Sequence, residues 1–165
     1  MGGSLNITSV NTQLKLQSNT IIALAKGFTP EQARWKPDQE NWSVLGVLNH
    51  LVDEEINDFR KHLNHTLLPQ EKSLGGEKQY NDQDLDEALA VFRTEREKSI
   101  AWLVSLIAPD WDKKIVFPWG TLTTGDMLVS WLAHDLLHMR QLVELQYMLN
   151  KLTYEPYSVE YAGKW

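Results

Sequence analysis

Two histidines lie four residues apart in the segment His134-Asp135-Leu136-Leu137-His138. On an α-helix this spacing puts both imidazoles on one face, one turn apart. HExxH helices present two nitrogens to zinc with the same spacing, although the glutamate of that motif is absent here. The chain contains no cysteine, so a transition-metal site would have to use imidazole and carboxylate ligands. The pair therefore predicts part of a metal site, which needs a third ligand from elsewhere in the chain.

The remaining histidines and nearby carboxylates are the candidates for that ligand. His62 and His65 fall near the end of a predicted helix, where a C-terminal dipole favours exposed histidines. His50 lies within the same helix, with Glu54 one turn later. A straight helix places His50 about 170° from the middle of the apolar stripe. The helical wheel alone therefore predicts a surface histidine at this position.

Hydrophobic periodicity predicts four long helices. Ser43 and Asp84 are predicted N-caps, and Thr29 with Gln32 predicts a capping box at a short helical turn. Residues 110–123 are irregular or form a short hairpin, although Pro118 disfavours a strand. The helices are expected at about residues 5–26, 43–66, 85–107 and 124–151, with an exposed loop at 68–81 and an aromatic tail at 153–165 that packs on the bundle or on a partner subunit.

Four long helices with almost no strand predict an all-α four-helix bundle, formed by a single domain over residues 1–165. The connection between the second and third helices has more than a dozen residues. It is long enough to cross the length of a helix, so these two helices can be parallel or antiparallel.

Three of the predicted stripes contain polar residues near the middle. Such groups cost roughly 1–3 kcal/mol each if they are buried without partners. They therefore form a hydrogen-bonded layer that fixes helix pairing, or they surround a bound group. The second stripe, from Leu45 to Leu63, has no such gap. The polar positions are Gln17 in the first helix, Arg96 and Ser99 in the third, and His134, His138 and Gln141 in the fourth.

The composition excludes several classes of function. Sixteen basic and twenty-two acidic residues give a net charge of −6, which argues against non-specific nucleic-acid binding and against docking on an anionic membrane. No stretch approaches the roughly 18 apolar residues of a membrane span, and the N-terminus has no features of a secretory signal. We therefore expect a cytoplasmic protein that binds neither nucleic acid nor membrane.

Two longer patterns resemble the DinB-like family. The first is Trp42-Ser43 followed by His50-Leu51 and Glu54, and the second is Pro118-Trp119-Gly120 followed by Gly125-Asp126-Met127-Leu128 and the run from Trp131 to Leu142. The resemblance spans essentially the whole chain. It implies an up-down-down-up bundle with the long crossover between helices 2 and 3, and a frequent homodimer. It also implies a three-histidine metal site, which maps onto His50, His134 and His138.

The resemblance leaves the activity open, because the family includes thiol S-transferases, proteins called metal-dependent hydrolases and members without known activity. Three neutral imidazoles keep the full charge of a divalent ion and leave a position open for water or a thiol. Our leading expectation is a metal-dependent transferase that activates a low-molecular-weight thiol. The alternatives are a metal-dependent hydrolase of a small substrate and a non-enzymatic bundle that binds metal or ligand.

Several details of the site remain open at this stage. Zinc or nickel is the expected ion, with iron or manganese as alternatives. Glu54 and Gln141 each lie one turn from a histidine and could orient it, or they are a solvated charge and a polar core contact. Arg140 could hold an anionic substrate or be an exposed helix arginine, and Arg96 has no assigned role.

Overall fold

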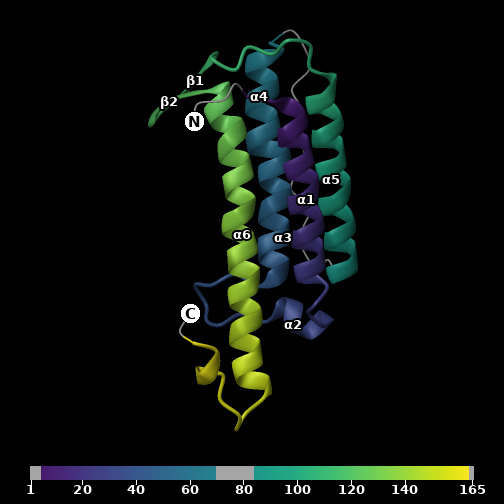
Figure 1. Cartoon of the computed structure of the whole chain (residues 1–165), viewed down its shortest axis with the longest axis vertical. Coiled ribbons are helices and arrows are strands. Elements are labelled where there is room, and N and C mark those ends of the chain that lie inside the picture. The colour runs from purple at the N-terminus through teal and green to yellow at the C-terminus, as the bar shows by residue number, and fades with distance from the viewer. Residues whose placement is uncertain (1–4, 70–83, 164–165) are drawn as a thin grey trace.

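Long helices packed side by side make up the computed structural model, which describes residues 5–69 and 84–163 (Figure 1). The second long helical segment is continuous along the chain but contains a π-helical turn, η1, between two α-helical parts. The elements are α1 (Ile7–Ala25), α2 (Pro30–Arg34), α3 (Val44–Asp53), η1 (Glu54–Phe59), α4 (Arg60–Leu67), α5 (Leu85–Ser105), β1 (Lys114–Phe117), β2 (Gly120–Thr123), α6 (Thr124–Thr153) and the 3₁₀ turn η2 (Glu160–Ala162).

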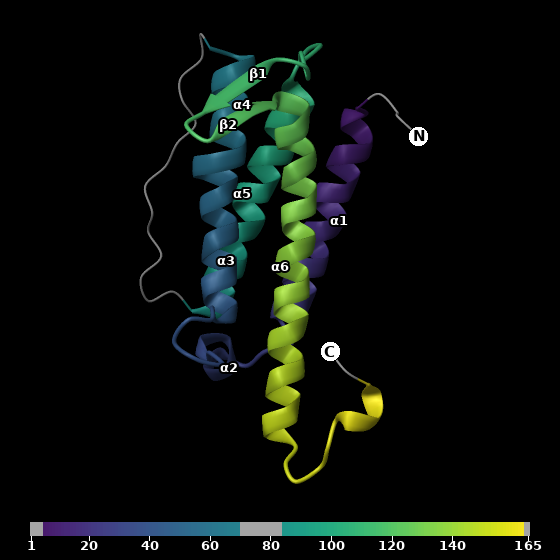
Figure 2. The ribbon, with the colours of Figure 1, turned by 90° about the vertical axis from the view of Figure 1, so that its left-hand side faces the viewer.

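The helix directions confirm the up-down-down-up bundle. Helices α1 and α6 run from the end that carries the hairpin toward the opposite end, whereas the α3–α4 segment and α5 both run the other way (Figure 2). Parallel second and third segments require a connection from one end of the bundle to the other. Most of the loop predicted at 68–81 belongs to that connection, and residues 70–81 lie outside the described residues.

The helix starts follow from local sequence chemistry. Ser43 accepts a hydrogen bond from the Gly46 amide at 3.1 Å, and Asp84 accepts one from the Glu87 amide at 2.8 Å. Both side chains satisfy amides that lack a partner within the helix. Thr29 forms the predicted capping box at α2. These three predicted caps are confirmed.

Strands β1 and β2 form an antiparallel hairpin in which Phe117 pairs with Gly120. Pro118 and Trp119 occupy the turn between them. Pro118 therefore needs no ladder hydrogen bond, which explains why a proline is compatible with this hairpin. The hairpin leads directly into the capping box of Thr123 and Asp126 that begins α6.

The hydrophobic core consists of two clusters along the bundle axis. One includes Ile21, Leu48 and Phe92, and the other includes Leu14 and Trp131. Polar side chains that are almost completely buried, among them Arg96, lie where the clusters meet. The Arg96 guanidinium is 5.4 Å from the Phe92 ring and 5.8 Å from the Trp131 ring. A polar layer therefore crosses the middle of the bundle.

The sequence predicts that the aromatic C-terminal segment packs on the bundle or on a partner subunit, and the structure contradicts the first of these. It folds back beside the protruding end of α6 (Figure 1), and the side chains of Tyr154, Tyr157 and Tyr161 are exposed. The expected packing of these tyrosines on the bundle is therefore wrong for residues 154–163, because α6 extends past the ends of its neighbouring helices. Packing on a partner subunit stays a prediction. No helix of the described part of the chain is long and apolar enough to cross a membrane.

Candidate metal centre

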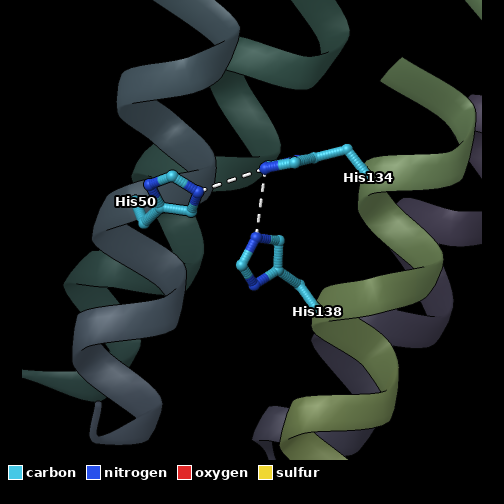
Figure 3. Close-up of side chains that lie close together, drawn as sticks. All are labelled: His50, His134 and His138. Atoms are coloured by element: carbon cyan, nitrogen blue, oxygen red, sulfur yellow. Dashed lines mark hydrogen bonds between the residues drawn. The ribbon is translucent and has the colours of Figure 1, made fainter. Parts of the chain in front are cut away.

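Three histidine side chains converge from two helical segments. His50 projects from α3, and His134 and His138 project from α6 (Figure 3). The Nε2 atom of His134 lies 3.1 Å from the Nε2 atom of His50 and 3.1 Å from that of His138. One ligand atom from each of the three residues lies within 4.8 Å of the others. The tertiary structure thus brings together residues that are 84 positions apart in the sequence.

The geometry of this cluster fits a divalent ion. Nitrogens at the usual zinc distance of about 2.0–2.1 Å are roughly 3.3 Å apart in a tetrahedral site, close to the 3.1 Å that separates His134 Nε2 from each of the other two. The Nδ1 atom of His138 is 3.0 Å from Oε1 of Gln141. Because an amide oxygen only accepts, this contact places the proton on Nδ1 and leaves the Nε2 lone pair free for a metal.

The other two histidines differ in their outer contacts. The Nδ1 atom of His50 lies 3.8 Å from a carboxylate oxygen of Glu54, an ion-pair distance. The Nδ1 atom of His134 is buried and has no hydrogen-bond partner. Glu54 and Gln141 thus lie where the sequence predicted groups that orient ligands, and that role stays a prediction.

Aromatic side chains surround the imidazoles. The Trp42 ring centroid lies 4.6 Å from that of His50 and 6.0 Å from that of His138, while Phe59 contacts His134 edge-on at 5.4 Å. Gly46 allows the close approach of Trp42, since a Cβ atom at this position would lie 3.3 Å from the Trp42 Cβ atom. Apolar walls of this kind weaken the competition of water for the charge of an ion.

The π-turn explains why the helical wheel misplaced His50. A π-turn has i→i+5 hydrogen bonds and carries an extra residue, which shifts the phase of the preceding helix by about 100°. Upstream of η1 the completely buried positions include Val47 and Leu51, whereas Leu45 of the predicted stripe is only half-buried. His50 is about 60° from Val47 on this wheel. Its side chain is 25% exposed and borders the buried face.

The predicted stripe of α6 also needs a correction. We expected His134, His138 and Gln141 within the buried stripe, but all three are half-buried, and the buried position beside them is Asp135. The predicted stripe follows the two histidines, whereas the side chain that is completely buried between them is that of Asp135. The histidines lie at the border of the core face, where they reach toward α3.

The sequence model of the DinB superfamily matches residues 13–142, which include all three histidines. The chain belongs to the DinB superfamily. No curated protein matches its sequence.

Two solved structures of similar fold come from Bacillus subtilis. YfiT, described as a probable metal-dependent hydrolase with an unusual four-helix bundle topology, superposes with a TM-score of 0.72 at 16% identity and covers 91% of this chain and 93% of its own. The DinB-like protein YjoA superposes with a TM-score of 0.62 at 18% identity and covers 85% of this chain and 91% of its own. At these identities the similarity establishes the DinB fold and leaves the reaction open.

The pKa of His134 is lowered from 6.5 to about 4. Burial is the largest cause, and the neighbouring His138, His50 and Arg96 contribute to the same shift. Burial also lowers the pKa of His138. Both imidazoles are therefore neutral in this DinB fold at neutral pH, which is the form that binds a metal.

The low pKa of His134 predicts an acid sensitivity of the metal-free protein. Its unfolded state takes up a proton on His134 below about pH 6.5, whereas the folded state does so only near pH 4. Stability is therefore lost as the pH falls through this window. Urea unfolding at pH 7.5 and pH 5 should show a smaller loss in His134→Gln than in the wild type. Equal losses in both proteins would contradict the low pKa.

Two buried carboxylates, neither of them predicted from the sequence, lie on the two helical segments that carry the histidines. Glu55 and Asp135 are completely buried and bind Arg96 from α5. Glu55 could have been found as a carboxylate on the buried side of the π-turn, but only if that turn had been recognised. Ser99 also contacts Glu55, at 2.5 Å. Arg96 and Ser99 thus belong to a polar layer and not to the histidine cluster.

The remaining sequence candidates lie away from the three imidazoles. Gln17 donates a hydrogen bond to the Leu132 carbonyl at 3.1 Å and so links α1 to α6. Arg140 is exposed. This agrees with the second of its two predicted roles, that of an exposed helix arginine. His62 lies beside Phe117 of the hairpin, and His65 is exposed near the end of α4.

Proposed function

We propose that this DinB-superfamily protein binds one divalent metal ion through His50, His134 and His138 and uses it to activate a low-molecular-weight thiol for transfer to a small electrophile. Convergence of the three Nε2 atoms supports the metal site. A divalent ion held by three neutral imidazoles keeps its full charge and can lower the pKa of a thiol that binds to it. Zinc and nickel are among the ions that suit such a ligand set.

The support for thiol transfer comes from the composition of the chain. A divalent ion lowers the pKa of a bound thiol as it does that of a bound water, so the ion by itself allows both reactions. Glu54, at ion-pair distance from His50, is a carboxylate that could accept a proton in either reaction. The chain supplies no thiol of its own, so the sulfur would come from a cofactor.

Thiol-dependent conjugation tests the reaction. Metal-loaded protein is incubated with monochlorobimane and, in turn, bacillithiol, mycothiol, glutathione or coenzyme A. We expect one of these thiols to be conjugated faster in the presence of metal, and the increase to disappear in His138→Ala. Exposed His65 provides the control, since His65→Ala should keep the full rate. Equal rates with and without metal for every thiol would reject the transferase.

A metal-dependent hydrolase is the second candidate, favoured by the fold similarity to YfiT, the probable metal-dependent hydrolase. In that case Glu54 would serve as the proton acceptor, since it is the carboxylate nearest to His50. Hydrolysis of ester or amide substrates without added thiol, lost in Glu54→Gln while the metal stays bound, would identify this reaction. A folded protein that binds metal and shows neither reaction would leave the third alternative, a non-enzymatic binding bundle.

We further propose that the protein is a cytoplasmic homodimer, as the family resemblance implies. The exposed side chains of Leu136 and Leu137 on α6 and of Tyr157 in the tail provide apolar surface for a second copy. Sedimentation equilibrium should give twice the chain mass of 19.0 kDa. A monomer at micromolar concentration would reject this assembly.

A further inference from the structure

One arginine, Arg96, contacts both ligand-bearing segments of the bundle. Its Nε atom donates to Glu55 at 2.5 Å, and its two terminal nitrogens donate to the Asp135 carboxylate at 2.6 and 2.9 Å. Glu55 belongs to η1, and Asp135 to α6. A third helix, α5, therefore fixes the relative position of the other two through one planar guanidinium.

Each carboxylate of this layer is held in one orientation. The Glu55 oxygens also accept from the Ser99 hydroxyl at 2.5 Å and from the Trp131 indole N–H at 3.0 Å. Arg60 in turn donates to the Ser99 hydroxyl oxygen at 3.1 Å. The donors around Glu55 suit the ionised carboxylate, because an ionised carboxylate only accepts. The layer is therefore rigid and leaves little freedom for η1 or α6 to slide.

One end of this clamp is adjacent in sequence to a histidine of the metal centre, and the other lies little more than one helical turn from one. Asp135 directly follows His134, and Glu55 directly follows Glu54, whose carboxylate lies beside His50. We propose that Arg96 is a positioning residue for the three-histidine site, since it holds Glu55 and Asp135 together and thereby sets the separation of His50 and His134. This inference rests on the proposed metal site for its functional meaning, but the separation itself exists in the metal-free protein.

The geometry favours positioning over a general stabilising role. A buried ion triad is often no better for stability than well-packed apolar side chains. The bidentate contact with Asp135 fixes direction as well as distance. Ligand geometry within about 0.5 Å matters for a metal site. Asp135 transmits the position of the clamp to the adjacent His134, and Glu55 transmits it to His50 through little more than one helical turn.

Two variants test the positioning role. Asp135→Asn keeps an oxygen that can accept from Arg96 and is expected to fold, while Arg96→Lys keeps the charge but loses the planar fork. The first readout is the set of nuclear Overhauser contacts between the His50 and His134 rings in metal-free protein, whose centroids lie 5.1 Å apart. The second is the zinc dissociation constant from competition with a chelator.

We expect both variants to lose the ring contacts and to bind zinc about 10–100-fold more weakly. Glu95→Gln is the matched control: the Glu95 carboxylate forms its ion pairs with Arg60 and Lys98 and not with Arg96. It should lose stability and keep both the ring contacts and the zinc affinity.

The outcomes separate this inference from the proposed function. Folded variants that keep the ring contacts and the wild-type zinc affinity would overturn the positioning role while leaving the metal site intact. A wild type that binds no zinc, but whose ring contacts still depend on Arg96, would reject the proposed function and support the positioning role. Weaker zinc binding of equal size in the Glu95 control would assign the effect to stability and overturn the inference.

Discussion

Alanine at His134 or His138 is expected to abolish stoichiometric metal binding. Each substitution removes one of three nitrogens that lie within 4.8 Å of one another. Loss of a group that only orients a ligand costs about 10–100-fold in affinity, and loss of the ligand itself costs more. Metal content by plasma emission, measured after purification without an affinity tag, should fall from about one ion per chain to near zero.

His50→Ala is expected to have the same effect, although this histidine comes from a different segment. The exposed His65 provides the matched control, and His65→Ala should keep the full metal content. Circular dichroism should show that all variants keep their helix content, because none of the three histidines lies in an apolar cluster. Wild-type protein free of metal after expression in supplemented medium would contradict the site.

Removal of the buried cation should be the most destabilising single change in the polar layer. Arg96→Met leaves Glu55 and Asp135 completely buried without their shared positive partner. Breaking a buried ion pair by removing one partner costs about 3–5 kcal/mol, because the other charge remains desolvated. Chemical unfolding at neutral pH should show a decrease of this size, whereas exposed Arg140→Met should stay within about 0.5 kcal/mol.

Acidification should restore part of the stability of the same variant. Burial already raises the pKa of the Glu55 carboxyl in the folded protein against the opposing effect of Arg96, and removal of Arg96 takes that opposition away. The folded variant then binds more protons than the unfolded chain, so part of the lost stability should return as the pH falls from 7 toward 5. Unfolding curves at both pH values measure this change. A variant that loses further stability on acidification would show that the carboxylates are not buried as described.

Much of the fold follows from local sequence. Helix stripes such as those of α1 and α5 put Leu14, Ile21 and Phe92 in the core, as predicted. Caps at Thr29, Ser43 and Asp84 depend only on residues within one turn. These features were predictable because the interactions that produce them lie within a few positions of each other.

Less of the site was predictable, since it depends on phase and on distant partners. The spacing of His134 and His138 indicated a pair on one face, but residues 84 positions away had to supply the third nitrogen. The family resemblance, and not the wheel, pointed to His50. No sequence pattern predicted that Asp135, between the two histidines, would bind an arginine of α5.

Local sequence therefore accounts for the four long helices, the N-caps Thr29, Ser43 and Asp84 and the histidine pair of α6, and the family resemblance accounts for the crossover bundle. The tertiary structure decided how the second segment faces the others, because the π-turn at Glu54–Phe59 shifts the phase of α3 by about one residue. That shift brings His50 to the border of the core and turns Glu55 toward Arg96. A straight helix buries the same face along its whole length. The α3–α4 segment buries one face before the π-turn and another after it, as it packs against α5 and α6.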